Sequence, residues 1–214
     1  MKKIIAVIMS LLILAPVYAD NLQKSIDKQL EKAQKKEMKE KKKAYEKAGF
    51  EIMGSHTMDV ALLKHYSKLN ELGDEGMVFE GIAQNTKSKN VATQMALNNA
   101  VITYAQKAGS TVKGRVVSDM MAEGTGADDA EFEKFYAAYE RLVEQNVKNV
   151  LIPSYSIIKT NPNGTYEVQS YFIVDESKAR AARLAALEKA VAETDLAQQY
   201  ANKVRNFVND RVEE

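Results

Sequence analysis

The chain of 214 residues contains no cysteine and no tryptophan, and only three prolines and two histidines. Without cysteine no disulfide can form, so the stability of the fold must come from packing alone. The formal net charge of +1 argues against general nucleic-acid binding. The apolar share of 45% is ordinary for a globular protein, so the chain can build a core.

The sequence also lacks the usual combinations of catalytic and cofactor-binding residues. A zinc site needs three or four converging ligands, and neither His56 nor His65 has such neighbours at a recognisable spacing. His65 falls on the apolar face of a predicted helix, which predicts a buried, hydrogen-bonded histidine. The glycines at 124 and 126 lack the lysine of a phosphate-binding loop. We therefore expect no enzyme activity, no metal and no cofactor.

The first nineteen residues have the pattern of an export signal. Lys2 and Lys3 precede an apolar run over 4–16, and small residues stand just before Asp20. The run is shorter than the roughly 20 residues that span a membrane. We expect cleavage after Ala19 and a mature protein in the periplasm or outer envelope. Because no cysteine follows, we expect no lipid anchor of that kind.

Residues 20–48 are predicted to form a charged helical segment. Residues 21–48 hold ten lysines and five acidic residues, a net charge of +5, whereas residues 119–144 have a net charge of −6. We expect the basic segment to steer acidic partners through Lys35, Lys36, Lys41, Lys42 and Lys43. Contact with a membrane surface is only weakly indicated, because the lysine-rich half has almost no apolar face to insert.

Residues 49–175 are expected to form an α+β core domain. The patterns predict a short strand at 50–54, a helix over 57–72, a strand over 77–83 and a helix that begins after Ser88. Residues 111–120 fit a strand or a second helix, and their β-branched residues favour the strand. A helix with a broad apolar face follows Asp128. Two β-rich runs around Asn161-Pro162-Asn163-Gly164 predict a hairpin, with a bulge or an edge strand at Pro153.

Residues 176–214 are predicted to form one long C-terminal helix that reaches about Val212. Such a helix exceeds the usual globular length, and pairing with the N-terminal helix as an antiparallel stalk would explain both lengths. The expected apolar anchors for a partner or a second copy of the chain are Leu184, Leu187, Val191 and Tyr200.

Three segments carry a family resemblance: Phe79-Glu80-Gly81-Ile82-Ala83, the alanines at 92, 96 and 100, and Gly114-Arg115-Val116-Val117-Ser118. Together they resemble the bacterial lipoprotein-20 family, whose fold is similar to the N-terminal domain of the flagellar assembly protein T. The resemblance implies a small antiparallel sheet of three or four strands with a helix across one face, in an exported protein of Gram-negative gut bacteria of the Bacteroides type. It implies no catalytic residues.

These observations together predict an exported, non-enzymatic cell-envelope protein that acts through contacts with other envelope proteins. The alternative is a periplasmic module that binds a glycan or peptide with Tyr155 and Tyr171. A hydrolase built around His56 and a carboxylate is a third interpretation.

Overall fold

A computed structural model describes residues 28–123, 129–194 and 198–208. The chain divides into two compact units, residues 1–47 and residues 48–214. In unit 1, residues 28–47 form a helix, as the lysine-rich sequence predicts. The predicted signal peptide lies outside the described residues.

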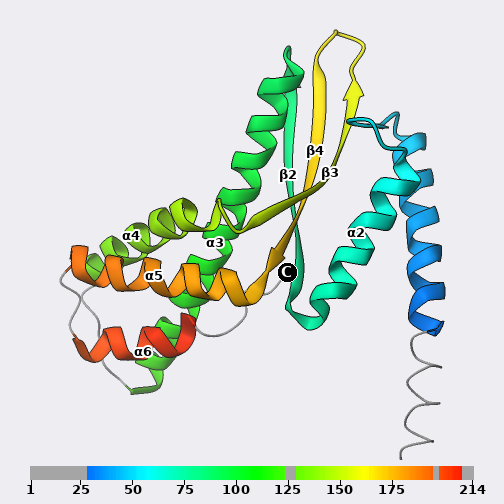
Figure 1. Ribbon diagram of the computed structural model, residues 1–214. Coiled ribbons are helices and arrows are strands. Elements are labelled where there is room, and N and C mark those ends of the chain that lie inside the picture. Colours follow the sequence, from blue (N-terminus) through cyan, green and yellow to red (C-terminus); the bar gives the residue numbers. More distant parts are fainter. Residues whose placement is uncertain (1–27, 124–128, 195–197, 209–214) are drawn as a thin grey trace, which may run out of the picture. The chain divides into compact units, whose positions relative to one another are not determined.

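Unit 2 is an α+β fold around a four-stranded antiparallel sheet with the strand order β1-β3-β4-β2. The strands are β1 (Glu51–Ile52), β2 (Gly76–Thr86), β3 (Leu151–Thr160) and β4 (Tyr166–Asp175). The helices are α2 (Met58–Leu72), α3 (Lys89–Glu123), α4 (Asp129–Val147), α5 (Glu176–Thr194) and α6 (Gln198–Val208), with a short 3₁₀ turn at Gly73–Glu75. The expected fold class and hairpin are confirmed (Figure 1).

Local chemistry explains where several elements begin and end. The Thr57 hydroxyl accepts from the Val60 amide at the start of α2, and Gly73 ends that helix with φ 54°. Ser88 caps α3 in the same way. In the hairpin turn the Asn163 carboxamide oxygen accepts from the Thr165 amide, and Gly164 takes the left-handed conformation at φ 76°.

The two faces of the sheet are covered by different helices. Gly81 of β2 lies against the backbone of α3 at Ala96 and Ala100. The neighbouring residue, Glu80, points to the opposite face of the sheet. It lies opposite Tyr171 on β4, which in turn lies opposite Tyr155 on β3. The ring of Tyr155 contacts His65 of α2. Because side chains alternate along a strand, α3 covers one face and α2 the other.

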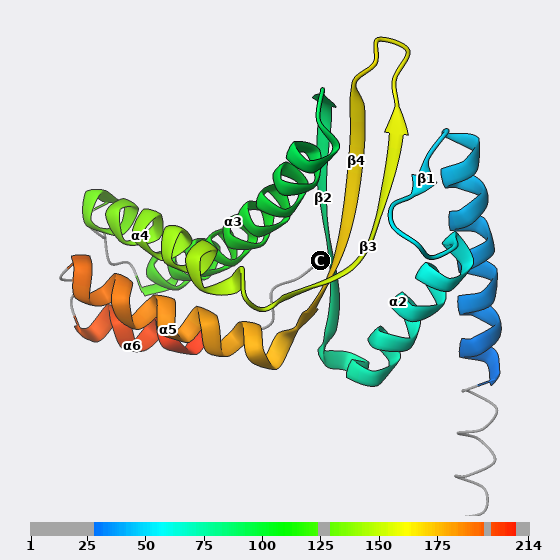
Figure 2. The same ribbon diagram turned by 45° about the horizontal axis from the view of Figure 1, so that its top comes forward.

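The second half of α3 forms a helical bundle with α4, α5 and α6 (Figures 1 and 2). One hydrophobic core runs from Phe79 on the sheet, through Tyr104 and Tyr139, to Val208 on α6. The apolar face predicted for α4 is confirmed. Its buried members are Phe132, Phe135, Tyr136, Tyr139, Leu142 and Val143.

Residues 111–120 are helical, so the strand favoured by the sequence is wrong. They continue α3, and Gly109 does not end that helix. Val112 and Val116 lie four residues apart, and both are buried in the bundle core. Burial of this helical stripe outweighs the modest preference of valine for strands.

The single long C-terminal helix is also wrong, because the chain reverses between α5 and α6. Arg205 on α6 donates to Glu188 on α5, with Nε 2.6 Å from Oε1, although the two residues are 17 positions apart. A continuous helix would hold them about 25 Å apart. The segment therefore folds into unit 2 instead of projecting as one arm of a stalk.

Candidate functional site

The sheet face under α2 brings together a histidine, a serine and two tyrosines. The register of β3 and β4 shifts between Pro153 and Tyr155, which is the bulge that Pro153 predicted. The bulge turns both Ser154 and Tyr155 toward α2. His65 Nδ1 lies 2.8 Å from Ser154 Oγ, and the rings of His65 and Tyr155 meet edge to face at 5.2 Å.

This arrangement explains the histidine on the apolar face of α2. His65 is 1% exposed and hydrogen-bonded, as predicted. A serine beside a histidine is the first element of a nucleophilic site, which would also need an accessible histidine and an oxyanion hole. Here His65 is enclosed edge-on by Tyr66 and Tyr155. The hydrogen bond therefore serves to satisfy a buried polar pair.

Tyr155 and Tyr171 contact each other and offer little surface to a ligand. Their rings stack at a centroid distance of 4.5 Å, and Tyr155 is 7% exposed. The Tyr171 hydroxyl lies 3.3 Å from Glu80 Oε1 and 3.2 Å from Gln169 Oε1, and it can donate its single proton to either oxygen. The stack thus covers one face of each ring, on which a sugar could otherwise lie.

A second polar cluster, which the sequence reasoning missed, lies inside the bundle. Arg183 and Glu176 are both about 1% exposed and form a bidentate ion pair, with Nη2 2.6 Å from Oε1 and Nη1 3.2 Å from Oε2. Arg183 also donates to the Tyr104 hydroxyl and to the Val208 carbonyl. The cluster joins α3, α5 and the end of α6, so we assign it a structural role.

A pattern in α5 could have revealed this cluster. Glu176 and Arg183 are seven residues apart, on the helix face that also carries the buried alanines 179, 186 and 190. Charged residues aligned with a buried stripe indicate an internal ion pair. The start of the helix follows ordinary capping, because the Asp175 carboxylate accepts from the Lys178 amide. The Ser177 hydroxyl donates to the same carboxyl and lowers its pKa.

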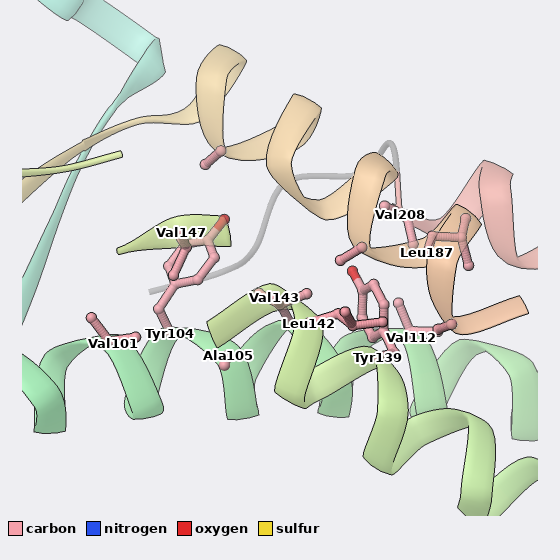
Figure 3. Close-up of a cluster of buried hydrophobic side chains, with 14 of the residues drawn as sticks. Val101, Tyr104, Ala105, Val112, Tyr139, Leu142, Val143, Val147, Leu187 and Val208 are labelled. Carbon is pink, nitrogen blue, oxygen red and sulfur yellow. The ribbon is translucent and has the colours of Figure 1, made fainter. Parts of the chain in front are cut away.

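Two tyrosine hydroxyls near the ion pair differ in their partners. Figure 3 shows Tyr104 and Tyr139 pointing from α3 and α4 toward α5. The Tyr104 hydroxyl accepts from Arg183, whereas the Tyr139 hydroxyl has no hydrogen-bond partner among the described residues. Burial raises the pKa of Tyr104 to about 12 and raises that of Tyr139 further.

The predicted apolar anchors lie inside the bundle. Leu187 is fully buried, and Leu184 and Val191 pack against the same core. These side chains stabilise unit 2 itself. Leu187 offers no surface to a partner, so its expected role as an anchor is wrong, whereas that of the partly buried Leu184 and Val191 stays a prediction. The side chain of Tyr200 lies outside the described residues.

The predicted lysines all lie on the helix of unit 1, where most pair with glutamates one turn away. Lys41 is 3.1 Å from Glu37, and three further pairs join Lys35 to Glu31, Lys36 to Glu40 and Lys42 to Glu46. Lys43 is exposed. Exposed pairs of this kind contribute about 0.3–0.5 kcal/mol each, so they leave the lysines able to turn toward a partner.

The remaining candidate for a binding surface is an apolar row on the outer face of α3. Val91, Met95 and Ile102 are 51%, 41% and 37% exposed and recur at i, i+4 and i+11, so they lie along one line of the helix. We call these three residues the α3 row. No acidic residue occurs between Gly81 and Ser118, while Lys87 and Lys89 lie near the start of the row.

Within the described parts of the chain, no helix is long and apolar enough to cross a membrane. The same residues contain no group of three or more histidine, aspartate or glutamate side chains placed to hold a metal ion. His56 is exposed in the loop before α2, where its Nε2 lies 3.0 Å from Lys64 Nζ.

Comparison of the chain with protein-family models, with curated proteins and with solved structures finds no match. The resemblance to the lipoprotein-20 family therefore stays a prediction that rests on the three segments quoted above.

Proposed function

We propose that this chain is an exported, non-enzymatic cell-envelope protein that acts through protein–protein contacts. The observation that best supports this function is the α3 row, which leaves three large apolar side chains on a helix whose opposite side is fully packed. The export signal that the sequence predicts in the first nineteen residues supports the compartment.

The chemistry around the α3 row suggests what binds there. The absence of acidic residues from Gly81 to Ser118, with Lys87 and Lys89 beside the row, favours a negatively charged partner. The same charge disfavours a second copy of α3 because the lysines would repel. The partner that fits is an acidic, amphipathic segment of another envelope protein.

Site-specific crosslinking tests this function. Because the chain has no cysteine, Met95→Cys provides a single attachment point for a photoreactive maleimide. Gln145→Cys, on an exposed position of α4, is the matched control. We expect Met95→Cys to capture one discrete envelope protein in intact envelopes, and Met95→Asp to weaken binding to that protein about tenfold or more. Capture of the same proteins from both positions, or from neither, would contradict the assignment.

The glycan- or peptide-binding alternative has less support. Its two aromatic residues, Tyr155 and Tyr171, stack on each other, and Tyr155 is buried. Saturable binding on a glycan array that is lost in a folded Tyr171→Ala variant would restore this alternative.

A further inference from the structure

The helix of unit 1 carries a continuous row of lysines along one side. The lysine face consists of seven residues that are all exposed: Lys28, Lys32, Lys35, Lys36, Lys39, Lys43 and Lys47. At about 100° per residue, these seven positions fall within roughly 120° of the helix circumference. Figures 1 and 2 both show residues 28–47 as a straight helix, which at about 1.5 Å per residue is about 30 Å long.

The acidic residues of this helix only partly offset the lysine face. Residues 28–47 contain nine lysines and four glutamates, so their net charge is +5. Glu31 and Glu40 flank the face and pair with Lys35 and Lys36, while Glu46 lies at its C-terminal end, 4.0 Å from Lys42. Such exposed pairs break easily when a stronger anionic partner arrives.

Apolar side chains contribute little to this surface. Leu30 is 51% exposed, but the lysine face itself has no large apolar residue. Binding would therefore be electrostatic and would not require insertion into an apolar layer. A straight row of charges that points one way fits a flat anionic surface, on which all seven lysines make contact at once. A globular acidic protein is curved and would meet only part of a row about 30 Å long.

We propose that the lysine face binds a membrane surface by contact with anionic lipid headgroups. Each lysine close to such a surface contributes about 1 kcal/mol, so a row of seven can hold a protein there without a lipid anchor. Contact of this kind goes beyond the proposed function, because it involves unit 1 and not the α3 row. It would keep unit 2 close to envelope partners.

Vesicle sedimentation tests the proposal with the purified protein that begins at Asp20, without the predicted export signal. The probes are vesicles of phosphatidylcholine with about one quarter phosphatidylglycerol, and vesicles of phosphatidylcholine alone, which measure any binding by apolar segments. We expect binding to the anionic vesicles at about 0.05 M salt and its loss at about 0.5 M salt, where charges are screened within a few ångströms.

A matched pair of variants tests the role of the lysine face. Lys32→Gln/Lys39→Gln removes two charges from the centre of the face, and we expect binding to the anionic vesicles to weaken about 30-fold. Lys41→Gln/Lys148→Gln removes the same charge from the opposite side of the helix and from the turn after α4, and should weaken it less than threefold. Circular dichroism confirms that both variants stay helical.

Three results would overturn the proposal. They are equal binding to neutral and anionic vesicles, equal weakening by the two variants, and binding to soluble poly-glutamate without binding to vesicles. The last result would assign the lysine face to an acidic polypeptide. None of the three affects the crosslinking from Met95, so this proposal and the proposed function can fail separately.

Discussion

At the scale of single residues, Gly81 fixes how closely α3 approaches the sheet. A Cβ atom at this position would lie 1.8 Å from the Ala96 carbonyl oxygen, a distance much shorter than real Cβ atoms show to non-bonded atoms. Ala96 and Ala100 keep the facing side of α3 equally small. Gly114, on the same helix, has no atom within 4 Å of such a Cβ.

We expect Gly81→Ala to lower the free energy of unfolding by about 3 kcal/mol or more, since backbone must move on one side of the contact. Gly114→Ala should raise it by about 0.5–1 kcal/mol, because alanine favours the helix over glycine. Urea denaturation of both variants measures the difference. Equal stability of the two variants would show that α3 does not approach β2 as described.

The hydroxyls of Tyr104 and Tyr139 provide a second matched pair. Tyr104→Phe removes an acceptor from the buried Arg183 guanidinium and should cost about 1.5–3 kcal/mol. Tyr139→Phe removes a buried hydroxyl with no partner among the described residues, so stability should stay the same or rise by up to about 1 kcal/mol. Urea denaturation at neutral pH distinguishes them. A larger loss for Tyr139→Phe would mean that its hydroxyl is hydrogen-bonded in solution.

At the scale of elements, α3 has two roles along its length. Its first half covers the sheet through Ala92, Ala96 and Ala100, and its second half supports the bundle through Val112 and Val116. The alanine stripe was readable from the sequence because it repeats at helical spacing. The valine-rich half was not, because valine favours strands locally and only the contacts with α4 and α6 make the helix the more stable state.

The helical state of residues 111–118 leads to a prediction about neighbouring valines. Val116 is 4% exposed and Val117 is 39% exposed. Val116→Asp should lower the free energy of unfolding by about 3–5 kcal/mol or abolish folding, because it buries an unpaired charge. Val117→Asp should change it by less than about 1 kcal/mol. Thermal unfolding followed at 222 nm tests both variants, and similar losses would contradict a helix with Val116 inside and Val117 outside.

At the scale of the whole molecule, the hydrophobic core around Tyr104 and Tyr139 joins the sheet to four helices of unit 2. The buried tyrosines of this core make its stability sensitive to alkaline pH. Burial raises the pKa of Tyr104 and of Tyr136 to about 12, and that of Tyr139 further. In the unfolded chain these phenols lose their protons near the ordinary value of about 10.

We therefore expect the free energy of unfolding to be constant up to about pH 9.5 and to fall between about pH 10 and 12, because the folded state holds protons that the unfolded state has released. Each such tyrosine contributes up to about 1.4 kcal/mol per pH unit in this range. Urea titrations at several pH values measure the slope, which should be smaller in Tyr139→Phe. A flat profile from pH 9 to 12 would contradict burial of these hydroxyls.

The sequence alone determined the features that depend on neighbours along the chain. These are the helix caps at Thr57 and Ser88, the turn at Asn161–Gly164, the bulge at Pro153 and the buried position of His65. Capping, turn geometry and apolar periodicity act over a few residues, so a single sequence contains the information that they need.

Only the tertiary structure decided which surfaces remain available for binding. Leu187 and Met95 are both apolar residues in the sequence, yet Leu187 fills the bundle core and Met95 lies on the outer face of α3. The packing of α5 against α4 and α6 buries Leu187, and it joins residues that are distant in the chain, such as Arg205 and Glu188, 17 positions apart. Burial depends on which elements meet in space, and their long-range contacts are not encoded in any local pattern.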